Sequence, residues 1–438
     1  MRLGTWATFT ASSSSSVVRP SLVVSLFFVG GQIFFYVFVL AANHLLDPIA
    51  FGRFYAAWAM LNVLVAPASV LSMVLMRYFA HANHSGGASA VGWALDDTLS
   101  WVVPWVAAIT LAVVAALNLT GALIGIDSVA LTLLVPITAA VVIVVEIARA
   151  AYQGMLRFVR FGLSWFTWCI MQCAFGIAGL ALVGTVWAAY AGMLLASFAT
   201  LFFLLIPFRS ATRAQQKAAR NSNPRRLEWQ AALPFCTAFG GLVLFNNADI
   251  FVAYLTMDAS NLGIYSAGAV LPKAILTATQ PIVQTVFPVV VHLHVASRGS
   301  GRAVFKGVCL ALVLAAAGGV FLWASGNLVC GGSVGIRFCN IPTMLILAVA
   351  AIPLSATRVW MTADLARHRF WLPHLPILVF AIFMATEGLQ HPANTKLALL
   401  YATAAWAMLA ITSLVKTWQS CCSRQARTAE TVQSPACK

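Results

Sequence analysis

The sequence has little charge, and most of the charge that it has is positive. Only 8% of its 438 residues are charged, with 26 Lys and Arg against 11 Asp and Glu, for a formal net charge of +15. Soluble domains carry about 25% charged residues. With 61% hydrophobic residues and a mean hydropathy of +0.90, the composition excludes a water-soluble globule.

Motifs of nucleotide hydrolysis and of metal chemistry are also missing. The sequence contains no G-x-x-x-x-G-K-[ST] loop, no H-E-x-x-H and no C-x-x-C. The carboxylates expected in loops on the outer side, Asp47, Asp127, Asp258 and Glu387, fall on four separate short loops. A membrane polysaccharide polymerase needs a catalytic cluster, so that reading is disfavoured. We expect a protein that is not an enzyme and has no cofactor beyond a coupling ion.

Long apolar runs dominate what is there. Runs of 18 or more apolar residues predict transmembrane helices, because lipid leaves no other partner for backbone N–H and C=O groups. The sequence predicts an all-α polytopic membrane protein with about twelve spans. They are expected at residues 21–42, 51–79, 98–117, 129–152, 161–183, 185–208, 231–254, 262–291, 303–323, 342–361, 372–386 and 397–416.

The placement of Lys and Arg predicts the orientation. With both termini in the cytoplasm, only Arg337 and Lys396 fall in loops on the opposite side, and positive residues in short loops mark the cytoplasmic face. The basic charge is therefore a topology signal, and we expect no nucleic-acid partner. We predict a multi-pass protein of the bacterial inner membrane, surrounded by membrane lipids.

The chain divides into two similar halves. Residues 1–208 and 229–417 are expected to form two six-helix bundles, joined by the basic cytoplasmic linker 209–228 and followed by a cytoplasmic tail, 418–438. Sliding the chain by 211 positions pairs Asp47 and Gly52 with Asp258 and Gly263, each pair at a loop-to-helix junction. An Asp at a helix start is favoured by capping. Each half is expected to have six spans, an even number, so the halves are predicted to be parallel repeats. This arrangement suits transport by alternating access.

Ionisable residues inside spans are candidates for function, because each costs about 2.5–3.5 kcal/mol to insert. Lys273 lies near the middle of the eighth span, and Asp249 lies in the outer half of the seventh. Their side chains form either a structural ion bridge or a site for substrate and a coupling ion. Helical spacing predicts a polar stripe facing a cleft. Its members are Lys273, Gln280 and Gln284, and the further polar candidates are Asn62, the repeat-mate of Lys273, and Asn246, on the face of Asp249.

Other polar residues and prolines in or near the spans are expected to have mainly structural roles. Pro67 and Pro281 interrupt the paired second and eighth spans and are expected to act as hinges. A local helix pair is the favoured reading of Glu146 and Arg149. Arg358 and Asp364 are favoured as anchors at the membrane interface. Cys330 and Cys339 share one outer loop, where they form either a disulfide or two free thiols.

Several short motifs resemble one known family. The run from Leu46 to Tyr55 with Met76 to Ala80, the Q-G-M-L-R-F segment at 153–158, and the N-N-A-D and L-G-I-Y-S-A segments at 246–249 and 262–267 are similar to the polysaccharide-biosynthesis (Wzx-like) flippases of the MOP exporter superfamily. The resemblance implies a two-lobed, MATE-like transporter with a cationic cavity, for which the candidate cations are Lys273, Arg53, Arg77 and Arg358. Its cargo would be an undecaprenyl-diphosphate-linked oligosaccharide, and a polysaccharide polymerase and glycosyltransferases would be its partners.

Roles for single residues follow from the resemblance. Lys273 and Arg53 would neutralise the diphosphate. Sugar hydroxyls would be bound by Asn62, Asn246, Gln280 and Gln284. Asp249 would take up a proton or Na⁺ to couple transport to an ion gradient. The alternative is a cation-coupled multidrug exporter of the same superfamily.

Overall fold

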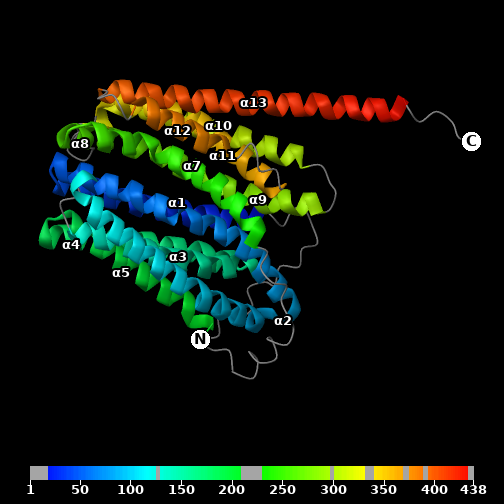
Figure 1. The fold of residues 1–438 in the computed structure, drawn as a ribbon, viewed down its shortest axis with the longest axis horizontal. Coiled ribbons are helices and arrows are strands. Elements are labelled where there is room, and N and C mark those ends of the chain that lie inside the picture. Colours follow the sequence, from blue (N-terminus) through cyan, green and yellow to red (C-terminus); the bar gives the residue numbers. More distant parts are fainter. Residues whose placement is uncertain are drawn as a thin grey trace, which may run out of the picture.

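The computed structural model describes residues 18–124, 129–208, 229–295, 300–330, 340–367, 374–387 and 393–432. Within these ranges the chain is helical (Figure 1). The first half holds α1 (Val18–Leu45), α2 (Pro48–Ile124), α3 (Val129–Gly154), α4 (Phe158–Val183), α5 (Val186–Leu205) and the short η1 (Ile206–Phe208). The second half holds α7 (Trp229–Thr256), α8 (Ala259–Ala278), α9 (Gln280–Val295), α10 (Gly301–Val329), α11 (Ile341–Ala366), α12 (Leu375–Glu387) and α13 (Asn394–Val432).

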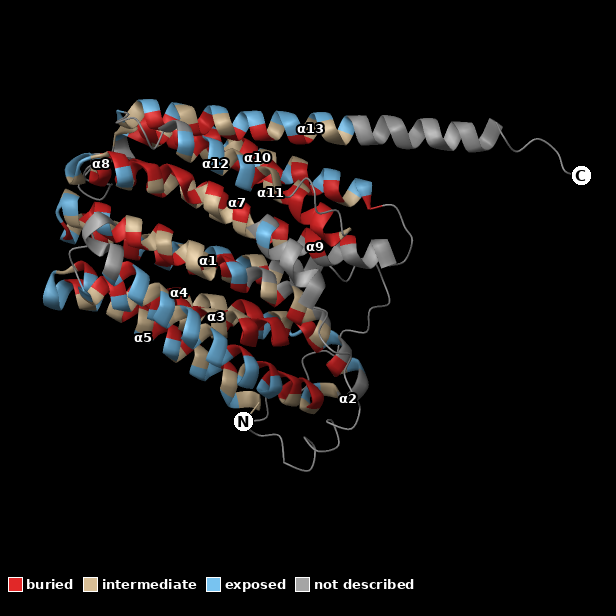
Figure 2. Cartoon of the chain, viewed as in Figure 1, coloured by how far each residue is buried: buried red, intermediate tan, exposed pale blue. Residues whose placement is uncertain are grey.

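The predicted class is confirmed, since ten described segments are long and apolar enough to cross a membrane. Two further expected spans correspond to α7, with 28 residues, and to α12, which has only 13. At 1.5 Å per residue α12 is about 20 Å long, short of the ~30 Å hydrocarbon core. Large apolar side chains such as Leu182, Leu26 and Trp323 point outward, and Figure 2 shows exposed residues along the outer helices. Such a surface is suited to lipid.

The second and third expected spans belong to one helix, α2, which folds back on itself. Gly87 has a φ of 65°, a left-handed conformation that ends the regular right-handed path. Asp47 and Leu117, near the two ends of α2, consequently line the same cavity. The sequence did not predict this continuity. Residues 209–228 and 433–438, the expected linker and the end of the expected tail, lie outside the described residues, and α13 continues to Val432.

The two prolines expected to act as hinges differ in their surroundings. α2 continues without interruption through Pro67, whose side chain is exposed. The chain does break between α8 and α9, at Thr279, two residues before Pro281. A proline has no N–H to donate to the preceding turn, so a helix break beside Pro281 is expected.

The two halves form separate groups of helices that meet along α1 and α2 on one side and α7, α8 and α9 on the other (Figure 1). Within the first half α2 packs on α3, and α4 packs on α1 and α5. Within the second half α11 packs on α8, α10 and α13. Asp364, expected as an interfacial anchor, is buried and pairs with Lys416, which ties α11 to α13.

The repeated Asp–Gly junctions meet at one end of the molecule, which we call the capped end. Asp47 accepts a hydrogen bond from the Ala50 N–H at 2.7 Å, and Asp258 accepts one from the Asn261 N–H at 3.3 Å, so both cap helix starts as predicted. The hydrogen bonds from Asn261 lower the pKa of the Asp258 carboxyl. The cap therefore persists above the usual Asp pKa and weakens as pH falls through the lowered value.

The repeated glycines allow the two halves to touch. A Cβ on Gly263 would lie 2.0 Å from the Pro48 carbonyl oxygen, and a Cβ on Gly52 would lie 2.9 Å from the Gly263 backbone nitrogen. Only glycines permit backbones to approach this closely. The repeat identified in the sequence is therefore a contact between the halves, which closes the molecule at the capped end.

Candidate functional site

A cavity of about 330 Å³ lies between the two halves. Its walls come from α1, α2, α3 and α4 of the first half and from α7, α8, α9 and α11 of the second. It extends past Lys273 to Gln153, Phe161 and Phe287, away from the capped end. Five of the residues predicted to bind substrate line it: Asn62, Asn246, Lys273, Gln280 and Gln284.

Arg53, which was also predicted to bind substrate, does not line the central cavity. It is exposed and lines a second cavity, on the other side of α2. A signal for this was present in the sequence, because Asn62 follows Arg53 by nine residues, which is two and a half turns of a helix. The two side chains therefore leave α2 on opposite faces, and only Asn62 faces the central cavity.

The two charged residues inside spans of the second half form an ion pair. Lys273 Nζ lies 2.8 Å from Asp249 Oδ1 and donates a second hydrogen bond to the Asn246 carbonyl oxygen at 2.9 Å. Asp249 is fully buried and also accepts a hydrogen bond from the Tyr265 hydroxyl at 3.3 Å. Lys273 lines the cavity, whereas the carboxylate lies behind it. The contact is the ion bridge of the structural reading, and it does not test the functional one, in which the pair binds substrate and a coupling ion.

Arg358 adds a second cation to the cavity, although the sequence favoured a place at the membrane interface for it. Its guanidinium lines the cavity and donates hydrogen bonds to the Leu276 carbonyl oxygen, at 3.2 Å, and to Gln280 Oε1. Leu276 lies in the last turn of α8, where carbonyls lack partners within the helix. A cation is also favoured at that end of a helix. The break between α8 and α9 thus creates the position that Arg358 occupies.

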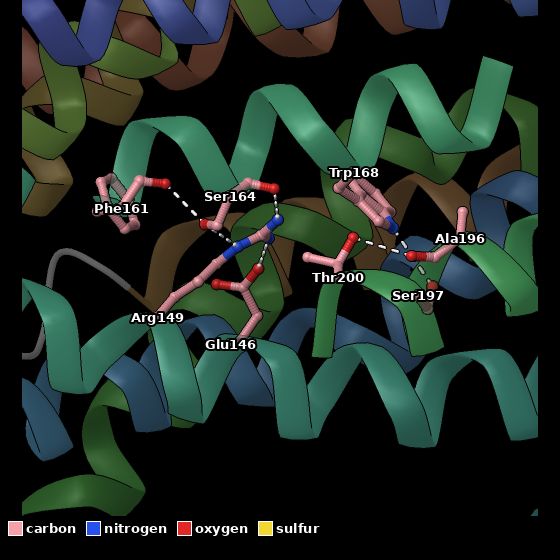
Figure 3. A network of polar contacts seen from close by, with 8 residues as sticks. All are labelled: Glu146, Arg149, Phe161, Ser164, Trp168, Ala196, Ser197 and Thr200. Carbon is pink, nitrogen blue, oxygen red and sulfur yellow. Dashed lines mark hydrogen bonds and ion pairs between the residues drawn. The ribbon is translucent and has the colours of Figure 1, made fainter. Parts of the chain in front are cut away.

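On the opposite wall, Glu146 and Arg149 form the local pair that was predicted, at 2.5 Å (Figure 3). Arg149 is 1% exposed and donates to both Ser164 Oγ, at 3.1 Å, and the Ser164 carbonyl oxygen, at 3.2 Å. Its guanidinium also stacks 4.0 Å from the ring centre of Trp165. Trp168 is held by a hydrogen bond to Ser197 (Figure 3). Glu146, Trp165 and Trp168 therefore present a fixed surface to the cavity.

The charges around the cavity do not cancel. Lys273 is balanced by Asp249, and Glu146 is balanced by Arg149. In the part of the chain that the structure describes, no carboxylate pairs with Arg358. One positive charge is left, within a membrane-spanning helix where an uncompensated ion is costly.

Several polar atoms at the cavity have no protein partner among the described residues. Each is buried and belongs to a side chain that lines the cavity: Gln32 Oε1, Trp165 Nε1, Asn246 Oδ1 and Gln284 Oε1. Buried polar groups are normally hydrogen-bonded, so these need water or a polar ligand. Within the described ranges, no group of three His, Cys, Asp or Glu side chains could hold a metal ion.

Comparison with known proteins defines the fold. No family model and no curated protein matches the chain. Solved structures do match: a multidrug resistance MATE family transporter of the MOP superfamily, in an outward-facing conformation, has a TM-score of 0.68 at 11% identity, covering 94% of this chain and 96% of that one.

Two further structures agree. A MOP superfamily transporter from Pyrococcus furiosus, described as having a binding pocket of reverse polarity, has a TM-score of 0.68 at 11% identity, covering 94% of this chain and 98% of that one. A eukaryotic MATE transporter has a TM-score of 0.61 at 10% identity and covers 95% and 98%. The chain therefore has the fold of these MATE transporters, as the resemblance implied.

Proposed function

We propose that this chain is a transporter that carries a lipid-linked oligosaccharide across the bacterial inner membrane by alternating access. The proposal rests above all on one observation: a cavity between the two halves, with Arg358 as a cation that no described carboxylate balances. A diphosphate linking lipid and sugar supplies the missing negative charge. An anion paired with a buried guanidinium is among the stronger polar contacts in proteins.

The other walls suit the rest of such a cargo. Sugar rings present C–H faces that pack on aromatic rings and hydroxyls that need hydrogen bonds, and the cavity offers Trp165 and Trp168 beside Gln284 and Asn246. In the proposed orientation both termini are cytoplasmic, the capped end faces the periplasm and the cavity extends toward the cytoplasm. Cargo made by glycosyltransferases on the cytoplasmic side would then enter, and a polymerase on the far side would consume it.

The second candidate is a cation-coupled multidrug exporter. The aromatic wall and the carboxylate of Glu146 favour cationic aromatic compounds, which bind aromatic faces. However, Glu146 already has Arg149 as its partner, and Lys273 and Arg358 repel a cation entering the cavity. The unbalanced charge therefore favours anionic cargo.

The two candidates differ in the phenotype of cells that lack the protein. We expect these cells to lose surface polysaccharide and to keep normal susceptibility to a panel of cationic drugs. Restoring the gene with Arg358→Ala should leave polysaccharide at least about tenfold below the wild-type level, because a lost charge-assisted contact is worth about 1.5–3 kcal/mol. Lys306→Ala, which removes an exposed cation from α10, is the matched control and should restore it fully.

Protein levels in the membrane are measured in every strain. Arg358→Ala at normal level with full polysaccharide would remove Arg358 from cargo binding. Broad drug sensitivity with intact polysaccharide would instead favour the exporter.

A further inference from the structure

A second cavity lies on the other face of α2. Its volume is about 580 Å³, and no residue that lines it also lines the central cavity. Its walls come from α2, α3 and α5 of the first half and from α7 of the second. The residues of α2 in its wall are Ile49, Ala50, Arg53, Ala56, Ala57, Met60, Val63, Leu64 and Leu117.

This cavity is polar at one end and apolar along the rest. Asp47, Arg53, Trp187 and Tyr254 lie where their helices begin or end, at the capped end of the molecule. Aromatic residues at such positions mark the level of lipid headgroups. Beyond them the α2 wall is apolar as far as Leu64.

The depth of the apolar part is close to that of one leaflet. Ala56 and Leu64, beyond Arg53, are eight residues apart along α2, which is about 12 Å at 1.5 Å per residue. One leaflet is half of the ~30 Å hydrocarbon core, or about 15 Å. Apolar cavities of this kind take up apolar guests in preference to water, and an acyl chain is the apolar guest that surrounds the protein.

We propose that this cavity binds one bilayer phospholipid, with an acyl chain along Ala56, Met60 and Leu64 and the phosphate at the guanidinium of Arg53. Arginine presents five N–H donors in a geometry that suits phosphate, so it can hold a headgroup beside other partners. Asp47 at the same mouth is complementary to the ammonium of phosphatidylethanolamine. The bound lipid is not the cargo, because α2 separates it from the central cavity.

The location gives the lipid a structural role. It contacts α2, α3 and α5 of one half and Ile250, Phe251 and Tyr254 of α7 in the other, at the same end where Gly52 meets Gly263. A ligand that binds one arrangement of the halves stabilises that arrangement. The phospholipid therefore favours the state that is closed at the capped end.

Native mass spectrometry of the purified full-length protein with palmitoyl-oleoyl phosphatidylethanolamine tests the site. We expect one saturable lipid on the wild-type protein. Ala56→Trp places an indole ring in the proposed path of the acyl chain and should weaken this binding at least about tenfold, the equivalent of 1.4 kcal/mol. Arg53→Ala leaves the apolar part intact and should weaken it about fivefold. Val313→Trp, at an exposed position on α10, adds the same bulk elsewhere and should bind as the wild type does.

A melting temperature for each variant shows whether it is folded, and added lipid should raise that of the wild type but not that of Ala56→Trp. Equal lipid binding by Ala56→Trp and Val313→Trp would overturn the site. If Arg53→Ala binds as the wild type does and an alkyl maltoside competes equally well, the cavity holds an apolar tail only, and the phospholipid assignment fails. None of these readouts depends on which cargo is transported.

Discussion

A Gly263→Ala protein is expected to lose the state closed at the capped end. The added Cβ would lie 2.0 Å from the Pro48 carbonyl oxygen, a backbone atom that cannot rotate away as a side chain can. The halves must therefore separate. Overpacking costs about 1–3 kcal/mol, which corresponds to a fall of roughly 5–150-fold in the population of the closed state.

The measurement is the transport rate of the reconstituted protein together with its melting temperature. Gly319→Ala in α10 is the matched control, because its Cβ would meet nothing within 4 Å and alanine is the better helix former. We expect Gly319→Ala to transport normally. Gly52→Ala should act in the same direction as Gly263→Ala, since its Cβ would approach the Gly263 nitrogen to 2.9 Å. Indistinguishable behaviour of Gly263→Ala and Gly319→Ala would show that this contact is not needed.

The second large effect is expected at the ion pair in the second half. Lys273→Met leaves Asp249 fully buried without its cation, and breaking a buried pair in this way costs about 3–5 kcal/mol. We expect a marked fall in melting temperature and in the yield of folded protein. Lys306→Met, at an exposed position, should change neither.

A double variant separates a structural role of this pair from a functional one. Lys273→Met with Asp249→Leu removes both charges, and such replacements are often neutral for stability. We expect this protein to fold nearly as well as the wild type and yet to fail in transport. Recovery of both stability and transport would make the pair a structural bridge only.

Asp249 is also the proposed site of ion coupling. Asp249→Asn keeps the Asn246 carbonyl as a partner for Lys273 but removes the group that takes up a proton or Na⁺. We expect transport into liposomes by this variant to lose its dependence on an ion gradient, while cargo still binds. Unchanged gradient dependence in Asp249→Asn would place the coupling elsewhere.

Local patterns predicted the parts of the fold that depend on neighbouring residues. Asp47 and Asp258 cap helices because a carboxylate at a helix start satisfies free N–H groups, which needs only the residues that follow. Lys273, Gln280 and Gln284 share the cavity because helical spacing places them on one face, even across the break at Thr279. The chain shift that paired the Asp–Gly junctions also identified two glycines that are in contact.

Features that depend on distant residues were missed or left open. The place of Arg358 depends on where α8 ends, since the Leu276 carbonyl that it contacts is on another helix. Residues near Arg358 in the sequence do not distinguish a place in the cavity from one at the membrane interface. The continuity of α2 through Gly87 also escaped prediction, because the interrupted apolar pattern there indicates two spans joined by a loop. Cys330 is disulfide-bonded, while Cys339 lies outside the described residues.

If the cargo is anionic as proposed, cargo and the end of α8 compete for the guanidinium of Arg358. A phosphate that drew the guanidinium toward itself would deprive Gln280 of its donor and leave the Leu276 carbonyl with the Thr279 hydroxyl alone. The turn between α8 and α9 would then lose a restraint at the moment when the cavity became occupied. Since α8 also carries Gly263, the change would reach the capped end along a single helix of about 30 Å. Cargo binding in the cavity and opening of the contact between Gly52 and Gly263 would thus be coupled through α8.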